Sequence, residues 1–296
     1  MQTLMNISGI HHITAIASSA ADNLSFYEDF LGLRLVKQTV NFDDPYTYHL
    51  YYGDDQGSPG TILTFFPWEN LPQGQPGAGM VSAVAFSIPR QSFDFWLQRI
   101  SHSGVPVEKE ERFGDPVIRF SDPHGLPLEL IGGPNGPATE FWNDGPSAVT
   151  NAINGFHSAT TTLNRIEEKK RLLSDVMGMT VHDRENNRSR FMLADRKAPG
   201  HFYDVIVDPD APTGRRGGGT VHHIAFRTED DESQINWQAK LRQSGYGATG
   251  VRDRNYFRSI YFHAPGGVLF EIATDPPGFA VDQALVELGS SLMLPT

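Results

Sequence analysis

The 296-residue sequence contains no cysteine. Disulfides, zinc ribbons, thiolate nucleophiles and iron–sulfur clusters are therefore excluded, because each of them needs a cysteine sulfur. His, Asp and Glu are the strong metal ligands that remain, so any metal site in this chain must use nitrogen and oxygen donors.

Clusters of Lys and Arg and long apolar runs are also missing. The formal net charge is −11, which argues against nucleic acid and anionic membranes as partners because both attract basic surfaces. No apolar stretch reaches the length of a membrane span, and the N-terminus has no basic segment followed by a long apolar one. We therefore expect a cytoplasmic protein with small-molecule partners. The sequence leaves the oligomeric state open and is compatible with a homo-oligomer.

Two distant segments of the chain align without a gap. The first has an expected strand at 10–17, a helix that begins near Ser19 and ends at Gly32, and a further strand. The second begins with GFHSATTT and repeats this order, with Ser158 in place of His12 and Gly178 in place of Gly32. Both pairs are 146 positions apart, which indicates an internal duplication.

A second pair of segments is more similar still. GMVSAVAFSIP and SDPHGLPLELIG match GTVHHIAFRTE and HAPGGVLFEIA, and Trp96 and Gly104 each recur 141 positions later as Trp237 and Gly245. We therefore divide the chain into four modules, each with one strand, one helix and about three further strands. The modules span 8–68, 79–132, 152–208 and 219–275.

The stretch between the second and third modules is rich in Gly, Pro, Asn and Asp, which is typical of a linker. We place a domain boundary there, with an N-terminal domain at 1–147 and a C-terminal domain at 148–296 that ends in a tail. A single βαβββ module leaves one face of its sheet exposed, so modules must pair. The predicted fold is α+β, with four βαβββ modules in two tandem domains whose curved mixed sheets enclose clefts.

The alternation of side chains along a strand indicates which polar residues face a cleft. In VHHIAFR, His223 alternates with a small and a polar residue, whereas His222 shares its face with bulky apolar residues that should pack on helices. The same argument, with less contrast, turns His12 rather than His11 toward the cleft. In GGVLFEIAT it turns Glu271 toward the cleft, and a carboxylate among apolar neighbours needs a partner.

Two imidazoles and one carboxylate form a facial triad, which leaves adjacent metal positions open and favours iron(II) in oxygenases. Manganese(II) has similar donor preferences and is the alternative. The matching positions in the sibling modules are Ser158, Ala83 and Glu129, which are too few ligands for a metal. We therefore expect one working cleft, formed by the first and fourth modules, and one that has lost its ligands.

Other polar residues have structural explanations beside functional ones. Glu129 is expected to be neutralised by an arginine, and His157 to be a hydrogen-bonded core residue. His49 alternates with aromatic residues in YHLYY. We treat it as a candidate substrate contact, with packing against the helix layer as the alternative.

Four segments together resemble the vicinal-oxygen-chelate (glyoxalase/bleomycin resistance/dioxygenase) superfamily, over nearly the whole chain. They resemble in particular its hydroquinone-type ring-cleaving dioxygenases, including those associated with methylhydroquinone resistance. The segments are GIHHIT at 9–14, YHLYYGDDQGSPGTILTFFPW at 48–68, TVHHIAF at 220–226 and RDRNYFRSIYFHAPGGVLFEIATDPPGF at 252–279.

The resemblance implies an extradiol-type dioxygenase that uses iron(II) and O2 to open a ring with para hydroxyls, or ortho hydroxyls in related members. It implies iron ligation by His12, His223 and Glu271. Catechol-cleaving relatives usually carry the triad in the second domain alone, and Ser158 removes a ligand there, so ordinary catechol cleavage is not expected. Further implied site residues near the substrate are His11, Thr14, His222, Arg254 and Tyr261.

Two other functions compete with this hypothesis. A glyoxalase-type isomerase or lyase usually has a fourth protein ligand on the last strand of the partner module, but that strand here reads TILTFF and offers none. A non-enzymatic protein that binds an aromatic compound or an antibiotic would not need the three ligands.

Overall fold

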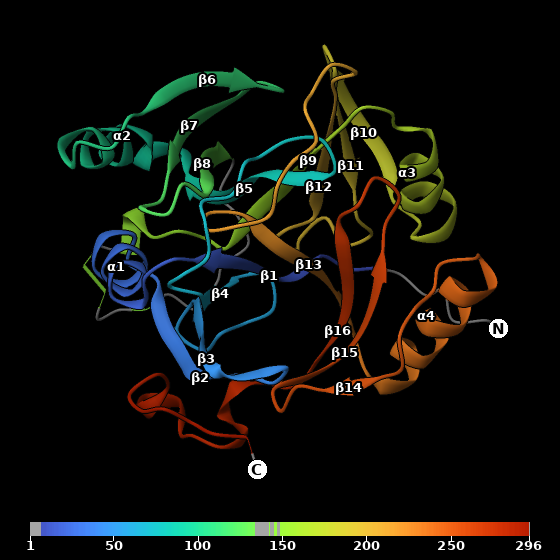
Figure 1. Cartoon of the computed structure of the whole chain (residues 1–296). Helices are drawn as coiled ribbons and strands as arrows, with labels where there is room; N and C mark the ends of the chain where they lie inside the picture. The colour runs from blue at the N-terminus through green and yellow to red at the C-terminus, as the bar shows by residue number, and fades with distance from the viewer. Residues whose placement is uncertain (1–6, 134–141, 143–144, 147–148, 296) are drawn as a thin grey trace.

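The protein, described here by a computed structural model, is built from two curved eight-stranded sheets with helices on their outer sides (Figure 1). The structure describes residues 7–133, 142, 145–146 and 149–295. The predicted α+β architecture is confirmed. No helix in these ranges is long and apolar enough to cross a bilayer.

Sheet I combines the first and fourth modules, in the strand order β14-β15-β16-β13-β1-β4-β3-β2. The first module consists of β1 (Ile10–Ala17), α1 (Ala20–Leu24), the π-helical turn η1 (Ser25–Phe30), β2 (Arg34–Asn41), β3 (Asp44–Gly53) and β4 (Ile62–Pro67). The fourth consists of β13 (Val221–Thr228), α4 (Asp231–Gln243), β14 (Arg252–Asp253), β15 (Phe257–His263) and β16 (Leu269–Pro277).

Sheet II combines the second and third modules, in the order β10-β11-β12-β9-β5-β8-β7-β6. The second module consists of β5 (Met80–Pro89), η2 (Arg90–Ser92), α2 (Phe93–His102), β6 (Glu108–Arg112), β7 (Asp115–Ser121) and β8 (Pro127–Gly133). After η3 (Val149–Asn151), the third consists of β9 (Phe156–Leu163), α3 (Glu167–Arg171), η4 (Leu172–Val176), β10 (Thr180–Glu185), β11 (Arg188–Met192) and β12 (Phe202–Val207).

The duplication read from the sequence is visible in the backbone. The helices of the first and third modules both end in a π-helical turn, η1 and η4. Gly32 and Gly178 follow these turns with φ angles of 76° and 75°, a left-handed conformation that favours glycine at a helix C-terminus. Matching positions therefore have matching conformations.

The predicted pairing of the first module with the fourth is confirmed by the strand order of sheet I. Strands β1 and β13 pair antiparallel at the centre of sheet I, and β5 and β9 pair in the same way in sheet II. Each sheet therefore takes one module from each half of the sequence. The predicted boundary between residues 147 and 148 lies outside the described residues, and the division into domains 1–147 and 148–296 remains a proposal.

The main hydrophobic core lies between the helices and the outer faces of the sheets and continues from one sheet to the other. Trp96 on α2 and Trp237 on α4, which the repeat aligns, are both fully buried in it. After β16 the chain continues through η5 (Phe279–Val281) and η6 (Leu285–Glu287) and runs beside β2. Figure 1 shows this red segment beneath the first module.

Candidate metal centre and active-site cavity

Three neighbouring strands at the centre of sheet I carry the predicted metal ligands. Strand β13 lies between β1 and β16, and its Ala225 pairs with His12 on one side and with Glu271 on the other. His223 stands two residues before Ala225, so its side chain leaves the same face of the sheet. The fold thus brings residues from the two ends of the chain onto one concave surface.

The donor atoms of these three side chains converge. Nε2 of His12 lies 3.3 Å from Nε2 of His223, and Oε2 of Glu271 lies 3.4 Å and 3.0 Å from these two nitrogens. Ligand atoms in adjacent positions on an ion with bonds of about 2.1 Å are about 3 Å apart. All three side chains are buried, and Oε2 has no hydrogen-bond donor among the described residues. The three residues therefore fit one metal ion.

Glu271 has no Arg or Lys partner within the described part of the chain. Its other oxygen, Oε1, accepts a hydrogen bond from the hydroxyl of Ser259 on β15. Burial raises the pKa of Glu271, but the attraction of His12 and His223 outweighs burial and holds the pKa well below its ordinary value. The carboxylate is therefore ionised, as a metal ligand must be.

A second histidine contacts each ligand imidazole. Nδ1 of His11 is 2.9 Å from Nδ1 of His12, and Nδ1 of His222 is 2.8 Å from Nδ1 of His223. One nitrogen in each pair must donate a proton and the other must accept it. When the ligand histidines donate, their Nε2 lone pairs are free for a metal, as is usual for metal-bound histidine.

Both histidine doublets lie at β-bulges. The pairing of β1 with β13 contains one extra residue at His11 and another at His222. A bulge leaves the extra residue unpaired and breaks the regular alternation of the strand. The expectation that His222 packs on the helix layer is therefore wrong, because His222 lines the cleft beside its neighbour His223.

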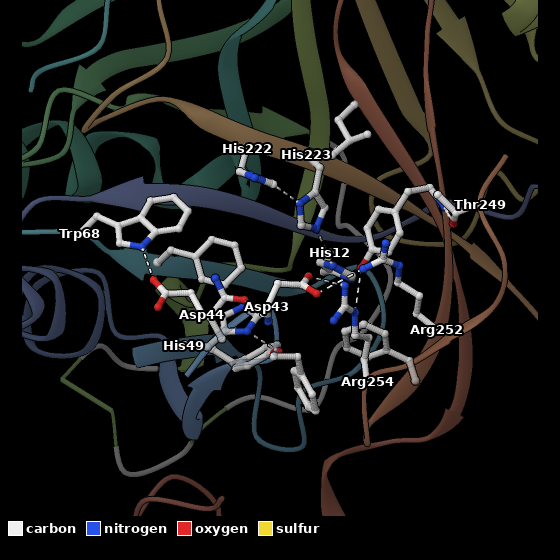
Figure 2. Close-up of a pocket in the computed structure, with 17 residues that line it drawn as sticks. His12, Asp43, Asp44, His49, Trp68, His222, His223, Thr249, Arg252 and Arg254 are labelled. Carbon is white, nitrogen blue, oxygen red and sulfur yellow. Dashed lines mark hydrogen bonds and ion pairs between the residues drawn. The ribbon is translucent and has the colours of Figure 1, made fainter. Parts of the chain in front are cut away.

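A cavity of about 400 Å³ opens beside the ligands (Figure 2). This volume lies within the usual range of small-molecule sites. Of the predicted catalytic and substrate-binding residues, His49, His222, Arg254 and Tyr261 line it. The aromatic residues in its wall are Phe42, Tyr51, Phe66, Trp68, Phe257 and Tyr261.

Two predicted site residues are not in the cavity wall. Thr14 is fully buried, and its hydroxyl accepts a hydrogen bond of 2.9 Å from Thr64. His11 is buried behind His12, and its ring centroid lies 5.1 Å from that of Phe257. His11 contacts His12 and Phe257, which line the cavity. Thr14 contacts Thr64, which is in turn bonded to the lining residue His49. Their predicted roles near the substrate remain predictions.

Arg254 and Tyr261 form a polar wall of the cavity. Nε of Arg254 donates a hydrogen bond of 3.2 Å to the Tyr261 hydroxyl. Burial lowers the pKa of Arg254, but Tyr261 and Asp43 raise it to a value above the ordinary one, whereas burial raises the pKa of Tyr261. A permanent cation and a neutral phenol therefore stand side by side near neutral pH.

The two other predicted cavity residues are neutral imidazoles. Burial lowers the pKa of His222 to about 3 and the pKa of His49 well below its ordinary value. Nε2 of His49 lies 2.8 Å from the Thr64 hydroxyl, and Nδ1 lies 2.8 Å from the Tyr51 hydroxyl. The alternative that His49 packs on the helix layer is excluded by its place in the cavity wall.

The pairing register identifies the position where a fourth ligand would stand. Glu271 on β16 pairs with Ala225, which follows His223 by two positions. In the same way, Thr64 on β4 pairs with Thr14, which follows His12 by two positions. Thr64 is thus the counterpart of Glu271 across the β1–β13 pair, and its hydroxyl is engaged by His49 and Thr14. Within the described residues, the potential metal ligands that cluster are the three predicted ones.

Sheet II lacks ligands at the matching positions, as predicted. Ser158 and Ala83 replace the two histidines, and Glu129 accepts hydrogen bonds of 2.7 Å and 2.9 Å from Arg112. Nδ1 of His157 lies 3.0 Å from the Ser158 hydroxyl. The structural roles predicted for Glu129 and His157 are confirmed.

Several residues that line the cavity or contact the candidate metal ligands were not identified from the sequence. Ser259 could have been found, because it stands two residues before Tyr261 on a strand beside that of Glu271. Asp43 and Trp68 carried no such signal. Asp43 is 211 positions from its partner Arg254. Trp68 ends the segment 48–68 that carries part of the family resemblance, but nothing in its spacing marks it as a cavity residue.

Comparisons with known proteins give matches over nearly the whole chain. The model of the glyoxalase/bleomycin resistance protein/dioxygenase superfamily matches residues 9–130 and 155–282. The "putative ring-cleaving dioxygenase MhqO" of Bacillus subtilis is 47% identical, over 97% of this chain and 91% of that protein. The chlorohydroquinone/hydroquinone 1,2-dioxygenase of Sphingobium indicum is 36% identical, over 99% and 92%.

Solved structures add evidence on the fold. The crystal structure of a "putative dioxygenase" from Bacillus subtilis has a TM-score of 0.94 and 46% identity, and covers 98% of this chain and 92% of that chain. A glyoxalase I mutant from Zea mays has a TM-score of 0.69 at 12% identity, over 91% and 95%. The latter similarity concerns the fold alone.

Proposed function

The chain belongs to the glyoxalase/bleomycin resistance protein/dioxygenase superfamily, and we propose that it is a ring-cleaving dioxygenase for hydroquinone-like aromatics. The observation that carries the proposal is the convergence of His12, His223 and Glu271 beside a cavity of about 400 Å³. Iron(II) is the proposed metal, because this donor set is typical of iron oxygenases. The names of the relatives support the ring-cleaving reaction and the hydroquinone class.

The three ligand residues would hold the ion, and the cavity would hold the substrate. When bound by these residues, iron(II) would supply binding positions for a phenolic oxygen and dioxygen and a path for electrons from the ring to oxygen. His11 and His222 would accept hydrogen bonds from the ligand imidazoles and so hold them in the tautomer that frees Nε2. The aromatic wall positions the ring and excludes water, which places both reactants side by side.

The polar wall would manage protons and charge. Tyr261 and His222 would exchange a proton with the substrate hydroxyl, since a neutral imidazole can both donate and accept. Arg254 would offset negative charge that develops on the substrate, because a guanidinium stays protonated. His49 would contact the substrate from the side of Tyr51, and Thr14 would act through Thr64.

The glyoxalase-type alternative lacks the ligand that it needs. Thr64 occupies the counterpart position of Glu271, and its hydroxyl is already engaged by two neighbours. An ion held by three protein ligands would keep positions for both substrate and dioxygen, which favours oxygenase over isomerase chemistry. A protein that only sequesters an aromatic compound would not require the buried carboxylate Glu271, whose unpaired oxygen is costly without a metal.

The test is anaerobic reconstitution with iron(II), followed by oxygen-uptake assays with hydroquinones, catechols and glutathione hemithioacetals. We expect uptake of one O2 per hydroquinone and a ring-opened product that contains both atoms of ¹⁸O2, with the extradiol-type cleavage next to a hydroxyl-bearing carbon. E271Q should lose iron and activity, while E129Q, the matched change in sheet II, should retain iron. Turnover of hemithioacetals without oxygen uptake would contradict the proposal.

A further inference from the structure

We propose that Asp43 makes the cavity selective for uncharged aromatic rings, because it neutralises the two arginines at the cavity mouth. Dihydroxylated rings that also carry a carboxylate would then be excluded. This inference rests on the proposed function, since it concerns which ring the site accepts.

Asp43 belongs to the tip of the β2–β3 hairpin, which forms part of the cavity wall. All four residues from Asn41 to Asp44 line the cavity, and the side-chain oxygen of Asn41 accepts a hydrogen bond of 3.0 Å from the backbone N–H of Asp43. This contact shapes the turn so that Asp43 extends toward the opposite wall, where Arg254 lies (Figure 2). The hairpin of the first module therefore reaches the fourth module across the cleft.

Both oxygens of Asp43 are used in ion pairs. Oδ2 accepts from Arg254 at 2.9 Å, and Oδ1 accepts from Arg252 at 3.2 Å. Both arginines line the cavity, so they are the cations that a negatively charged ring substituent would meet there. The carboxylate of Asp43 thus forms ion pairs with both guanidinium groups.

The charges at this end of the cavity sum to zero. Asp44 also lines the wall, and it accepts hydrogen bonds from the Thr47 hydroxyl and from Nε1 of Trp68. The bond from Thr47 lowers the pKa of Asp44, so this residue stays ionised. Two carboxylates therefore balance Arg252 and Arg254.

A ring carboxylate would have to displace Asp43 from its arginines without a gain in ion pairs. It would also stand close to the freed Asp43 and to Asp44, and like charges at short distance are unfavourable. A neutral hydroxyl meets no such penalty, because Arg254 can donate a hydrogen bond to it and Tyr261 can donate or accept one. Asp43 is thus a specificity-determining residue rather than a participant in ring cleavage.

The experiment is anaerobic titration calorimetry of the iron(II)-loaded protein with two probes, hydroquinone and 2,5-dihydroxybenzoate. We expect the wild type to prefer hydroquinone. In D43N this preference should fall by about tenfold, through tighter binding of the carboxylated probe, as expected for one or two partly exposed ion pairs. D43E, which restores the carboxylate, should keep the wild-type preference.

The matched control is D231N, which removes an aspartate from another exposed ion pair, that of Asp231 with Arg258. It should leave the preference unchanged. If D43N does not fold, as judged by thermal melting, D43S replaces it in the same comparison. Two results would overturn this inference alone. One is that D43N binds both probes with the wild-type preference, and the other is that the wild type binds both probes equally. Failure of both probes to bind the wild type overturns the proposed function with it.

Discussion

Glu271 and Glu129 occupy the same place in two copies of one module, and their neighbours decide what each can do. Glu129 is clamped by Arg112 and is therefore a neutralised structural carboxylate. Glu271 faces His12 and His223 with a free oxygen. A buried carboxylate needs either a cation of the protein or a metal ion. Glu129 has the first, and the surroundings of Glu271 fit the second.

Lys169 is a buried amine that forms no ion pair with the residues the structure describes. Its Nζ lies 4.3 Å from the ring centroid of Phe270 and has no hydrogen-bond partner among the described residues. Burial lowers the pKa of Lys169 from 10.5 to about 7. At about 1.4 kcal/mol per pKa unit, the protonated side chain costs up to about 5 kcal/mol of stability.

The pH dependence of stability tests this assignment. Between pH 7 and about 10 the unfolded chain keeps a proton on Lys169 that the folded protein releases, so the free energy of unfolding should rise with pH. K169M should abolish this rise and be more stable than the wild type at pH 6, by a few kcal/mol. Urea unfolding at several pH values measures both effects. K170M is the control on the same helix, and an unchanged pH slope in K169M would refute the prediction.

The C-terminal tail is an element that completes the concave face of sheet I. Phe279 on η5 stacks on Tyr256, with ring centroids 4.9 Å apart, and lies 5.2 Å from the ring of Tyr51. Lys37 on β2 donates a hydrogen bond of 2.7 Å to Asp282. Because Tyr51 contacts His49, the tail packs directly behind a residue that positions the cavity wall.

F279A should therefore affect both stability and the site. Removal of a buried aromatic side chain typically costs about 3–5 kcal/mol, and Tyr51 would lose the ring that holds it. We expect a lower urea midpoint and a higher KM for hydroquinone. V286A is the control, because Val286 lies on the same tail and is 88% exposed. Equal KM values for F279A and the wild type would show that the tail does not position the cavity wall.

At the scale of the whole molecule, the candidate metal centre joins the first and fourth modules of the chain. His12 belongs to the first module and His223 and Glu271 to the fourth, and these modules share sheet I. The same exchange occurs in sheet II, where β5 pairs with β9. Neither half of the sequence contains a complete sheet.

The residue ranges 1–147 and 148–296, produced separately, should each fail to retain stoichiometric iron(II). Their co-expression should restore iron binding, because the β1–β13 and β5–β9 pairings can form between chains. Iron analysis of the purified fragments and of the reconstituted complex provides the measurement. Stoichiometric iron in either fragment alone would contradict the shared site.

The sequence by itself determined the repeat, the approximate strand and helix bounds and the three candidate ligands. These features follow from local rules, namely hydrophobic periodicity, glycine at helix ends and side-chain alternation along a strand. The pairing of the first and fourth modules could also be inferred, since otherwise His12 would be separated from Glu271. The ring-cleaving family was recognisable from four segments.

Only the tertiary structure decided how these residues are supported. The bulges that bring His11 and His222 beside the ligands arise from the pairing of two distant strands, so local alternation misplaced His222. The contact of Asp43 with Arg254 and the packing of Phe279 behind Tyr51 likewise join segments that are far apart in sequence. Long-range pairing sets which groups meet, and no local periodicity encodes it.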